Sequence, residues 1–326
     1  MATPHDTLFR LAFGRPANAR DLLRKALPRA IAEGIDWRSL RVIDATFIDR
    51  RLRKLQTDLL FSARLRGRRV LLYVLIEHKS RDDRWTVLQL FTYIGAIWRR
   101  YQRDHRREKR LPPILPFVLH HGDEAFTAPC NLRALLDLEG LPAALVAMQP
   151  EFTFALDDLA SQSEEQLQAR VGSCFAKLAL LCLQRLRTGD ARKVAATLRG
   201  WGQLMERLRV TGSGQDDLLA VFSYLFEVAG LPDEQLHTIL TDITPRSTHK
   251  MITAAEHIRR RTRKEVMPKF MAAGQARLVL LLLQEKFGAL PPKLVARIRR
   301  ARMETLEGWF ARALKANVLD NVFAES

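Results

Sequence analysis

The 326-residue chain is long enough for two or three domains, and its 47% apolar residues exclude wholesale disorder. Its longest apolar stretches, 70–76 and 278–283, are too short to span a bilayer, and the N-terminus lacks a signal-peptide pattern, so we expect a cytoplasmic protein without membrane contact. Lysine and arginine number 53 against 36 acidic residues, a net charge of +17 that suits a polyanionic partner. Arginine-rich proteins that never contact DNA show the same balance, so charge alone selects no chemistry.

The first part of the chain predicts two helices followed by two strands. Apolar residues recur at three- and four-residue spacing over residues 6–13 and 18–33, which is typical of helices that bury one face. Residues 56–65 and 69–77 then predict strands joined by a tight connection at Arg66-Gly67-Arg68. The second strand is almost continuously apolar, as expected of a central strand covered on both faces.

Helical spacing returns over residues 84–101, and another strand follows it. Prolines at 112, 113 and 116 exclude a helix, so residues 114–120 predict an extended strand that enters a turn at Gly122. Helices and strands in this order predict an α/β arrangement for residues 1–155.

Strand signals vanish after about residue 155. Apolar spacing predicts helices over residues 164–186, 191–208, 216–229, 233–240, 275–287, 292–302 and 305–316. We therefore expect an all-helical second half, divided into a domain over 156–270 and a small C-terminal domain over 271–326. The three cysteines, Cys130, Cys174 and Cys182, have no metal-type or redox spacing. The last two lie eight residues apart in a helical pattern, which favours core packing and a reducing compartment.

The predicted hairpin carries the residues that point to chemistry. If the turn centres on Gly67, Asp58 lies nine residues before it and Glu77 ten after it, so antiparallel pairing would oppose the two carboxylates within about one residue. Opposed carboxylates repel each other unless a cation lies between them. Lys79, two residues beyond Glu77, would leave the same face of the strand. Two carboxylates and an amine suit a Mg²⁺ site that binds a phosphate oxygen and activates a water. On the pattern alone, Glu77-His78-Lys79 could instead mark the exit of the strand into solvent.

These residues also resemble a known signature. Asp58, eighteen intervening residues and Glu77-x-Lys79 resemble the motif of PD-(D/E)XK nucleases. The segments HDTLFRLAF, TDLLFSARL, YVLIEHKS, LQLFTYIGAIW and LPPILPFVLHHG, in this order, resemble the recombination-promoting nuclease (Rpn) family, whose members are also described as YhgA-like transposases. This resemblance covers about residues 4–130. Residues 274–314 resemble a small C-terminal domain of unknown function that is often fused to such nucleases.

The resemblance implies a restriction-endonuclease-like core, with a mixed central sheet flanked by helices, and a Mg²⁺-dependent endonuclease that cuts double-stranded DNA in recombination or DNA mobility. Asp58 and Glu77 would be metal ligands, and Lys79 would orient the attacking water and stabilise the developing charge. Two positions depart from the pattern. Family members often have glutamine at the position of Lys79, and Thr57 replaces the proline that commonly precedes the first aspartate.

Further positions carry weaker signals. Gln89 and Tyr93 share a helical face and resemble the Gln-x-x-x-Tyr motif of RecB-like nucleases, although such pairs are common in amphipathic helices. Asp6 could supply an upstream acid, or it could simply cap the first helix. The histidines match no zinc spacing, so we expect no metal-ligand role for them: His78, His120 and His121. The basic runs 99–110 and 259–264 are candidate phosphate contacts or solvated faces.

Three classes of function remain open from the sequence. The leading hypothesis is the endonuclease, which could act as a homodimer through the helices after residue 160. The alternative is a catalytically inactive DNA- or protein-binding module that keeps the nuclease fold. A DDE transposase would need a third carboxylate, such as Asp123 or Glu124, and the Glu-x-Lys pair argues against it.

Overall fold

The computed structural model describes residues 3–43, 59–77, 83–170, 172–186, 190–244, 248–261, 267–288, 290–316 and 318–323. Its internal contacts divide the chain into two compact units, Met1–Ala255 and Glu256–Ser326. None of the helices in these described segments is both long enough and apolar enough to cross a membrane.

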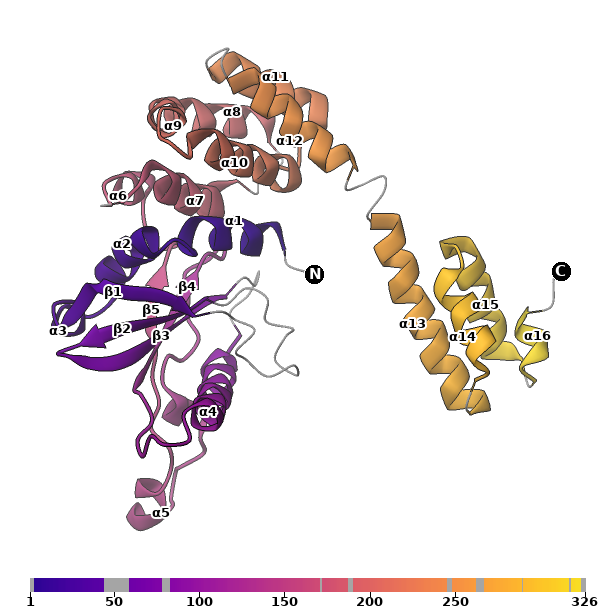
Figure 1. Ribbon diagram of the computed structural model, residues 1–326, viewed down its shortest axis with the longest axis horizontal. Helices are drawn as coiled ribbons and strands as arrows, with labels where there is room; N and C mark the ends of the chain where they lie inside the picture. The colour runs from indigo at the N-terminus through magenta and orange to yellow at the C-terminus, as the bar shows by residue number, and fades with distance from the viewer. Residues whose placement is uncertain are drawn as a thin grey trace. The chain divides into compact units, whose positions relative to one another are not determined.

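The first unit is built on a five-stranded mixed sheet, which confirms the predicted α/β class (Figure 1). The strands are adjacent in chain order: β1 (Ile35–Ile43), β2 (Leu59–Leu65), β3 (Arg68–Glu77), β4 (Ile114–His120) and β5 (Ala155–Asp158). The first three pair antiparallel, whereas β3, β4 and β5 are parallel to one another. Strands β1 and β5 were not predicted from the sequence, and the expected end of strand structure at about residue 155 was wrong because β5 extends to Asp158.

The β2–β3 hairpin is tighter than predicted. Leu65 pairs with Arg68, so the connection is the two-residue turn Arg66-Gly67 rather than three residues. Both turn residues have positive φ, 47° for Arg66 and 78° for Gly67, as two-residue hairpins with the right-handed strand twist require. Glycine adopts this conformation without steric cost, which explains its place in the turn.

Alternate residues of the strands face two separate cores. Phe61, Leu72 and Phe117 belong to a large cluster that also contains apolar residues of α1 (Pro4–Phe13), α2 (Pro16–Ala26) and α7 (Cys174–Arg185). Leu60, Leu71 and Val118 belong to a smaller cluster under α4 (Thr86–Asp104). The central strands are therefore covered on both faces, as the continuous apolar run of β3 predicted (Figure 1).

Two predicted helices are interrupted for local reasons. The helix predicted over residues 18–33 is broken at Pro28: α2 ends at Ala26 and α3 (Arg29–Ala32) follows, because the residue before a proline avoids the helical conformation. The helix predicted over residues 164–186 is divided into α6 (Glu164–Gln168) and α7. Ser163 and Ser173 cap the two pieces by accepting a backbone N–H of Gln166 and Ala176.

Of the remaining helices of the first unit, all except α5 extend the large cluster beyond the sheet. These remaining helices are α5 (Ala143–Ala147), α8 (Ala191–Gly200), α9 (Gly202–Arg209), α10 (Gly214–Val228), α11 (Asp233–Ile243) and α12 (His249–Arg261), the last of which continues past the unit boundary. Buried residues of α8 to α12 share one apolar cluster with the sheet. Cys182 lies in this cluster and Cys174 packs against it, as predicted. The division at residues 155 and 270 stays a prediction.

The second unit is helical and has its own core. Its helices are α13 (Met267–Phe287), α14 (Pro292–Arg300), α15 (Met303–Lys315) and α16 (Asp320–Phe323). Val279, Leu283, Ile298 and Trp309 are among the residues buried in this core.

Candidate active site

The carboxyl ends of the three parallel strands meet at one edge of the sheet. The strand register places Glu77 of β3 beside His120 of β4, and His120 beside Asp158 of β5. In α/β sheets, ligands bind outside the carboxyl ends of parallel strands. Two acidic residues and a histidine therefore lie in a row at the edge where the predicted site is expected.

The predicted catalytic residues are only partly within the described structure. Asp58 and Lys79 lie outside the described residues, as does His78, and Glu77 is described as the last residue of β3. Leu59, which follows Asp58 in the chain, pairs with Val74. The start of β2 and the end of β3 thus lie at the same edge of the sheet. The opposed carboxylates and the position of Lys79 stay predictions.

His120 is held in place by the neighbouring carboxylate. The residue is 2% exposed, and its Nδ1 forms a 2.8 Å hydrogen bond with Oδ1 of Asp158. Asp158 also accepts the backbone N–H groups of Phe126 at 3.0 Å and Ala160 at 3.1 Å. These bonds fix the imidazole and the loop after β4 next to the position of Glu77.

Gly122 closes over the other side of the imidazole. A Cβ at this position would lie 2.6 Å from Nε2 of His120 and 2.7 Å from its Cε1. The backbone therefore passes closer to the ring than any other residue allows. A glycine is therefore required at position 122 for packing against His120, in addition to the turn that the sequence predicts there.

Two further histidines connect the same edge to the helices. His121 is completely buried, and its ring centre lies 5.2 Å from that of His5 in α1. The hydroxyl of Tyr224 in α10 shares a 2.9 Å hydrogen bond with Nδ1 of His5 and donates to the carbonyl of Cys182 at 3.1 Å. The roles of Asp158, His5 and Tyr224 could not be predicted from the sequence, because their partners lie 38 and 219 residues away along the chain.

Asp6 lies next to His5 and has a structural role in α1. Thr3 is the N-cap, and the two residues form a capping box in which Oδ2 of Asp6 accepts the Thr3 N–H at 2.7 Å. The capping interpretation was correct in kind, although the N-cap is Thr3 rather than Asp6. The upstream-acid role of Asp6 stays a prediction.

The predicted Gln89–Tyr93 pair is in contact on α4. Nε2 of Gln89 donates to the Tyr93 hydroxyl at 2.6 Å, and both side chains are half-buried. The four-residue spacing on one helical face is thereby confirmed. Its role in a nuclease site stays a prediction.

Within the described parts of the chain, no three histidine, cysteine, aspartate or glutamate side chains lie close enough together to hold a metal ion. The predicted Mg²⁺ site includes Asp58, which lies outside the described segments, and it stays a prediction.

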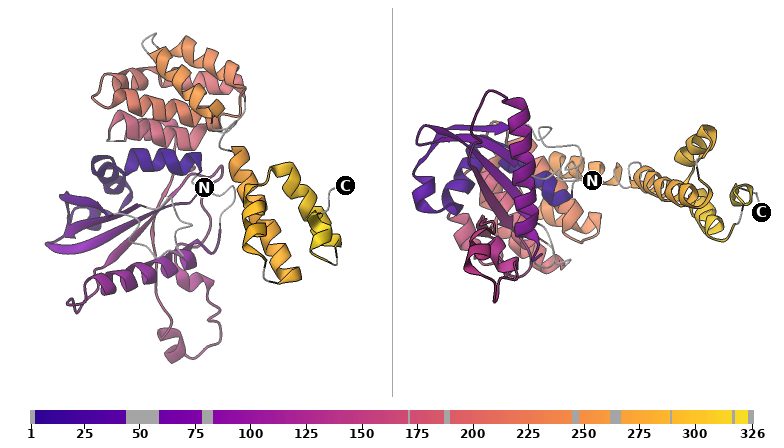
Figure 2. Two further views of the ribbon diagram at one scale, coloured as in Figure 1. Left: turned by 45° about the vertical axis from the view of Figure 1, so that its right-hand side comes forward. Right: turned by 90° about the horizontal axis from the view of Figure 1, so that it is seen from below.

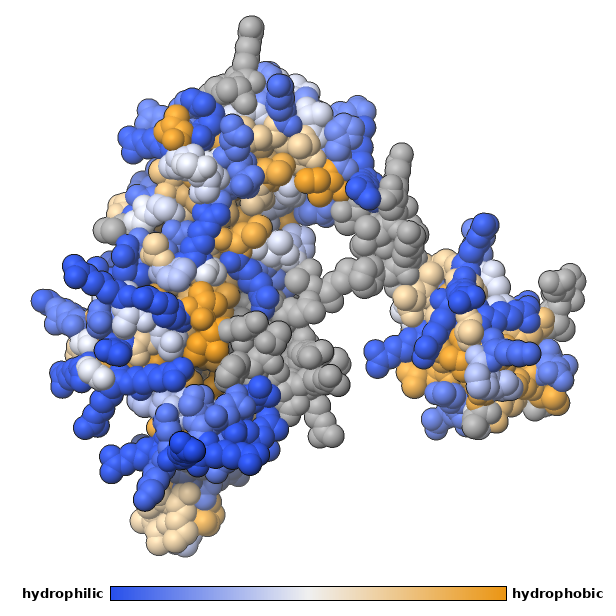
Figure 3. Space-filling view, viewed as in Figure 1, coloured by the Kyte–Doolittle hydropathy of each residue, from blue (hydrophilic) through white to orange (hydrophobic). Residues whose placement is uncertain are grey.

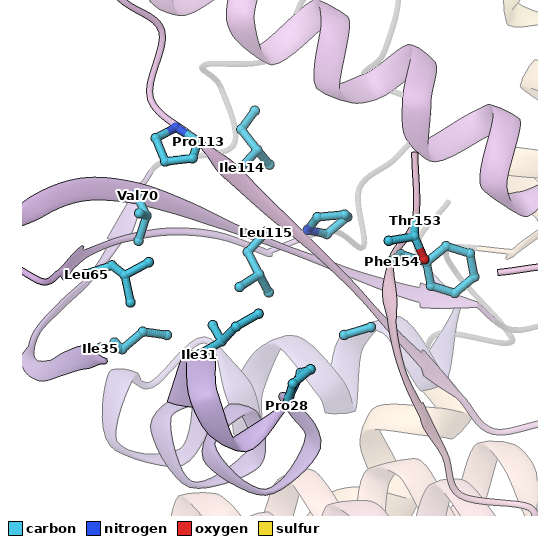
Figure 4. A pocket seen from close by; sticks show the side chains of 12 residues that line it. Pro28, Ile31, Ile35, Leu65, Val70, Pro113, Ile114, Leu115, Thr153 and Phe154 are labelled. Carbon is cyan, nitrogen blue, oxygen red and sulfur yellow. The ribbon is translucent and has the colours of Figure 1, made fainter. Parts of the chain in front are cut away.

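One apolar pocket lies at the opposite edge of the sheet (Figure 4). It has a volume of about 470 Å³ and is lined by residues such as Leu65, Val70, Ile114 and Phe154. Leu65 ends β2 and Ile114 begins β4, so the pocket lies at the amino ends of the parallel strands. Glu77 lies at the carboxyl end of β3 and thus at the other edge. No ionisable side chain lines the pocket, so it offers no group for acid–base or metal chemistry.

Comparison with known proteins finds one matching family and several similar proteins. The profile of the family described as "Putative transposase, YhgA-like" matches residues 3–213. Recombination-promoting nuclease RpnD of Escherichia coli O157:H7 is 36% identical over 124 residues, which are 38% of this chain and 47% of that relative. RpnC of Escherichia coli K12 is 32% identical over 122 residues, 37% of this chain and 40% of RpnC. The chain thus spans less than half the length of these two nucleases.

A third relative aligns along almost its whole length. The protein named "Inactive recombination-promoting nuclease-like protein RpnE", also of Escherichia coli K12, is 24% identical over 290 residues, 88% of this chain and 91% of RpnE. No solved structure matches. Since the family profile covers well over half of the chain, this protein belongs to the family described as "Putative transposase, YhgA-like" and is similar to recombination-promoting nucleases.

Proposed function

We propose that this chain is a DNA endonuclease that hydrolyses phosphodiester bonds during recombination, with its active site at the carboxyl edge of the parallel strands. The position of Glu77 carries this proposal. It is the only acidic residue of β3 and ends a strand that is otherwise apolar from residue 70 onward. It is also in register with His120 at the carboxyl edge of the parallel strands, where α/β sheets commonly bind ligands. The names of RpnD and RpnC as nucleases support the assignment.

The residue types at this edge suit a hard divalent cation. Carboxylate oxygens of Asp58 and Glu77 would hold Mg²⁺, which prefers oxygen ligands. A bound Mg²⁺ would neutralise charge on the scissile phosphate and make its bound water more acidic. The proposal requires Asp58 to approach Glu77. The pairing of Leu59, which follows Asp58, with Val74 of β3 supports this, because it puts the start of β2 near the end of β3.

The other residues of the edge have positioning roles in this proposal. The ammonium group of Lys79 would orient the attacking water and stabilise charge on the pentavalent phosphorus. The bond between His120 and Asp158 holds the loop after β4 beside Glu77. The proposed substrate is double-stranded DNA, a polyanion that suits the net charge of +17 of the chain.

The test is cleavage of supercoiled plasmid with Mg²⁺ or with EDTA. We expect cleavage by the wild type only with Mg²⁺, and a loss on the order of 100-fold for Asp58→Ala, Glu77→Gln and Lys79→Ala. Glu139→Gln is the matched control, because Glu139 is an exposed carboxylate of the same unit outside the proposed site. Equal rates for the wild type and all four variants would contradict the proposal.

A catalytically inactive DNA-binding module is the second candidate. The alignment with RpnE, a protein named as inactive, extends along 88% of this chain. This alternative predicts that the wild type binds duplex DNA and does not cleave it with Mg²⁺ or Mn²⁺. The same plasmid assay, combined with a binding measurement, separates the two functions.

A further inference from the structure

Two short segments together account for more than half of the net positive charge of this protein. Residues 64–69 and 99–110 contain eleven basic and two acidic residues, a net +9 out of the +17 of the whole chain. We call this set the distal basic surface: Arg64, Arg66, Arg68, Arg69, Arg99, Arg100, Arg103, Arg106, Arg107, Lys109 and Arg110. All are exposed except Arg100, which is half-buried. Figure 3 shows strongly hydrophilic side chains gathered over this part of the first unit, at the left and lower left.

The two segments meet in space. The guanidinium carbon of Arg69, at the start of β3, lies 5.8 Å from the centre of the Tyr101 ring in the last turn of α4, within the range of a cation–π contact. Because α4 runs back along the sheet between β3 and the parallel strand β4, its C-terminal end reaches the hairpin turn. The arginines of the hairpin and those of α4 therefore form one surface.

The two carboxylates of this surface are already engaged. Asp104 forms a 2.8 Å ion pair with Arg100, and Glu108 accepts the Tyr101 hydroxyl at 2.6 Å. Burial and the bond to Glu108 raise the pKa of Tyr101, so this residue stays a neutral donor near pH 7. The local field is therefore dominated by the arginines.

The surface is also hollowed. One depression of about 480 Å³ is lined by residues 103–108, and a second of about 330 Å³ lies between the last turns of α4 and residues 108–111. Both are bordered by arginine, whose planar guanidinium matches phosphate oxygens in a bidentate geometry. The apolar face of α4 packs on the sheet through Leu90 and Ile97, so it cannot insert into a lipid layer. A polymer of phosphates fits these features better than a membrane does.

The distal basic surface is remote from the proposed active site. Arg68 and Glu77 are the two ends of β3, and nine steps of about 3.3 Å separate them by roughly 30 Å. Figure 2 shows the hairpin turn and one end of α4 toward the same side of the sheet. A ligand that contacts both regions must be long.

We propose that the distal basic surface is a second binding site for the sugar-phosphate backbone of duplex DNA, roughly nine base pairs away from the bond that is cut. The spacing follows from about 3.4 Å per base pair. The choice of DNA as the polyanion rests on the proposed function. The surface holds the duplex in register and takes no part in the chemical step, so its loss should raise KM and leave kcat unchanged.

The test measures binding without cleavage. Anisotropy of a labelled duplex of about 20 base pairs is recorded in EDTA between about 50 and 300 mM NaCl, with the full-length protein. The variants are the triple Arg64→Gln, Arg66→Gln, Arg68→Gln and the triple Arg103→Gln, Arg106→Gln, Arg107→Gln. The matched control is Arg192→Gln, Lys193→Gln, Arg199→Gln, which removes the same charge from exposed positions of α8. All six substituted positions of the two test triples are exposed, and circular dichroism checks that each protein is folded.

Each test triple should lower the slope of the plot of log Kd against log salt concentration by about 2 to 3, because each phosphate contact contributes about 0.9 to that slope. The control should change the slope by less than about 1. Equal changes in all three triples would overturn the proposal, since only bulk charge would then matter. Stronger binding to anionic phospholipid vesicles than to the duplex, with the same sensitivity to the test triples, would also overturn it. The binding measurement is made in EDTA and does not depend on cleavage. A chain that fails to cleave plasmid could therefore still bind the duplex through this surface, so the two proposals are tested separately.

Discussion

Gly122 is packed against His120 so closely that a methyl group does not fit. A Cβ would lie 2.6 Å from Nε2 of a ring that is buried and held by Asp158 on its other side. Gly122→Ala must therefore displace the loop or break the bond between His120 and Asp158. We expect a loss of about 1–3 kcal/mol in the free energy of unfolding, measured by urea denaturation.

Gly95 provides the matched control for this substitution. It lies in the middle of α4, and a Cβ there would meet no atom within 4 Å. Gly95→Ala should stabilise the protein by about 0.5–1 kcal/mol, because alanine loses less conformational freedom in a helix. If Gly122→Ala proved as well tolerated as Gly95→Ala, the close approach to His120 would be wrong.

Single residues differ in how far the sequence reveals them. Glu77 was identified because an acidic residue after seven apolar ones is unusual on a buried strand. The spacing of Gln89 and Tyr93 was sufficient because helical geometry brings such positions together. Asp158 and Tyr224 could not be found in this way, because their contacts with His120 and His5 depend on how distant elements pack.

At the scale of elements, strong periodic patterns predicted the structure and short or mixed ones did not. Strands β2, β3 and β4 and helix α4 were predicted from long apolar patterns. In contrast, β1 has only two buried residues among nine, and β5 is four residues long with two aspartates. Such strands are stabilised by pairing with a neighbour rather than by their own apolar pattern.

A buried ion pair links β5 to the segment after α6. Arg170 donates to both oxygens of Asp157 at 2.7 and 2.6 Å and also to Gln162 at 2.6 Å. The side chains of Arg170 and Asp157 are only 6% and 5% exposed. Arg170→Met should lower the free energy of unfolding by about 3–5 kcal/mol, because it leaves a buried carboxylate without its cation.

An exposed pair in the same unit is the control for this prediction. Arg133 and Glu151 form a 2.7 Å ion pair with side chains that are 33% and 74% exposed. Arg133→Met should cost less than about 1 kcal/mol, since solvent screens the interaction. Similar losses for Arg133→Met and Arg170→Met in the same urea titration would show that burial does not control the strength of these pairs.

At the scale of the whole molecule, the apolar cores show which parts depend on each other. The sheet face that carries Phe61, Leu72 and Phe117 shares one cluster with helices up to α12. The C-terminal helices bury their own apolar residues around Leu283 and Trp309. Helices predicted as a separate second half therefore contribute to the core on which the proposed active-site edge rests.

This sharing predicts how truncated chains behave. A fragment of residues 1–155 would expose the sheet face that α7 and α10 cover, and we expect it to be unfolded or aggregated. A fragment of residues 1–261 keeps that core complete and should unfold cooperatively near the temperature of the corresponding transition in the full chain. Differential scanning calorimetry of the full chain should then show two transitions, since each unit has its own core. A soluble 1–155 fragment with a cooperative transition would mean that the helices after residue 160 are dispensable for the sheet. In that case the contact of His5 with Tyr224 could not be needed to hold the edge that carries Glu77.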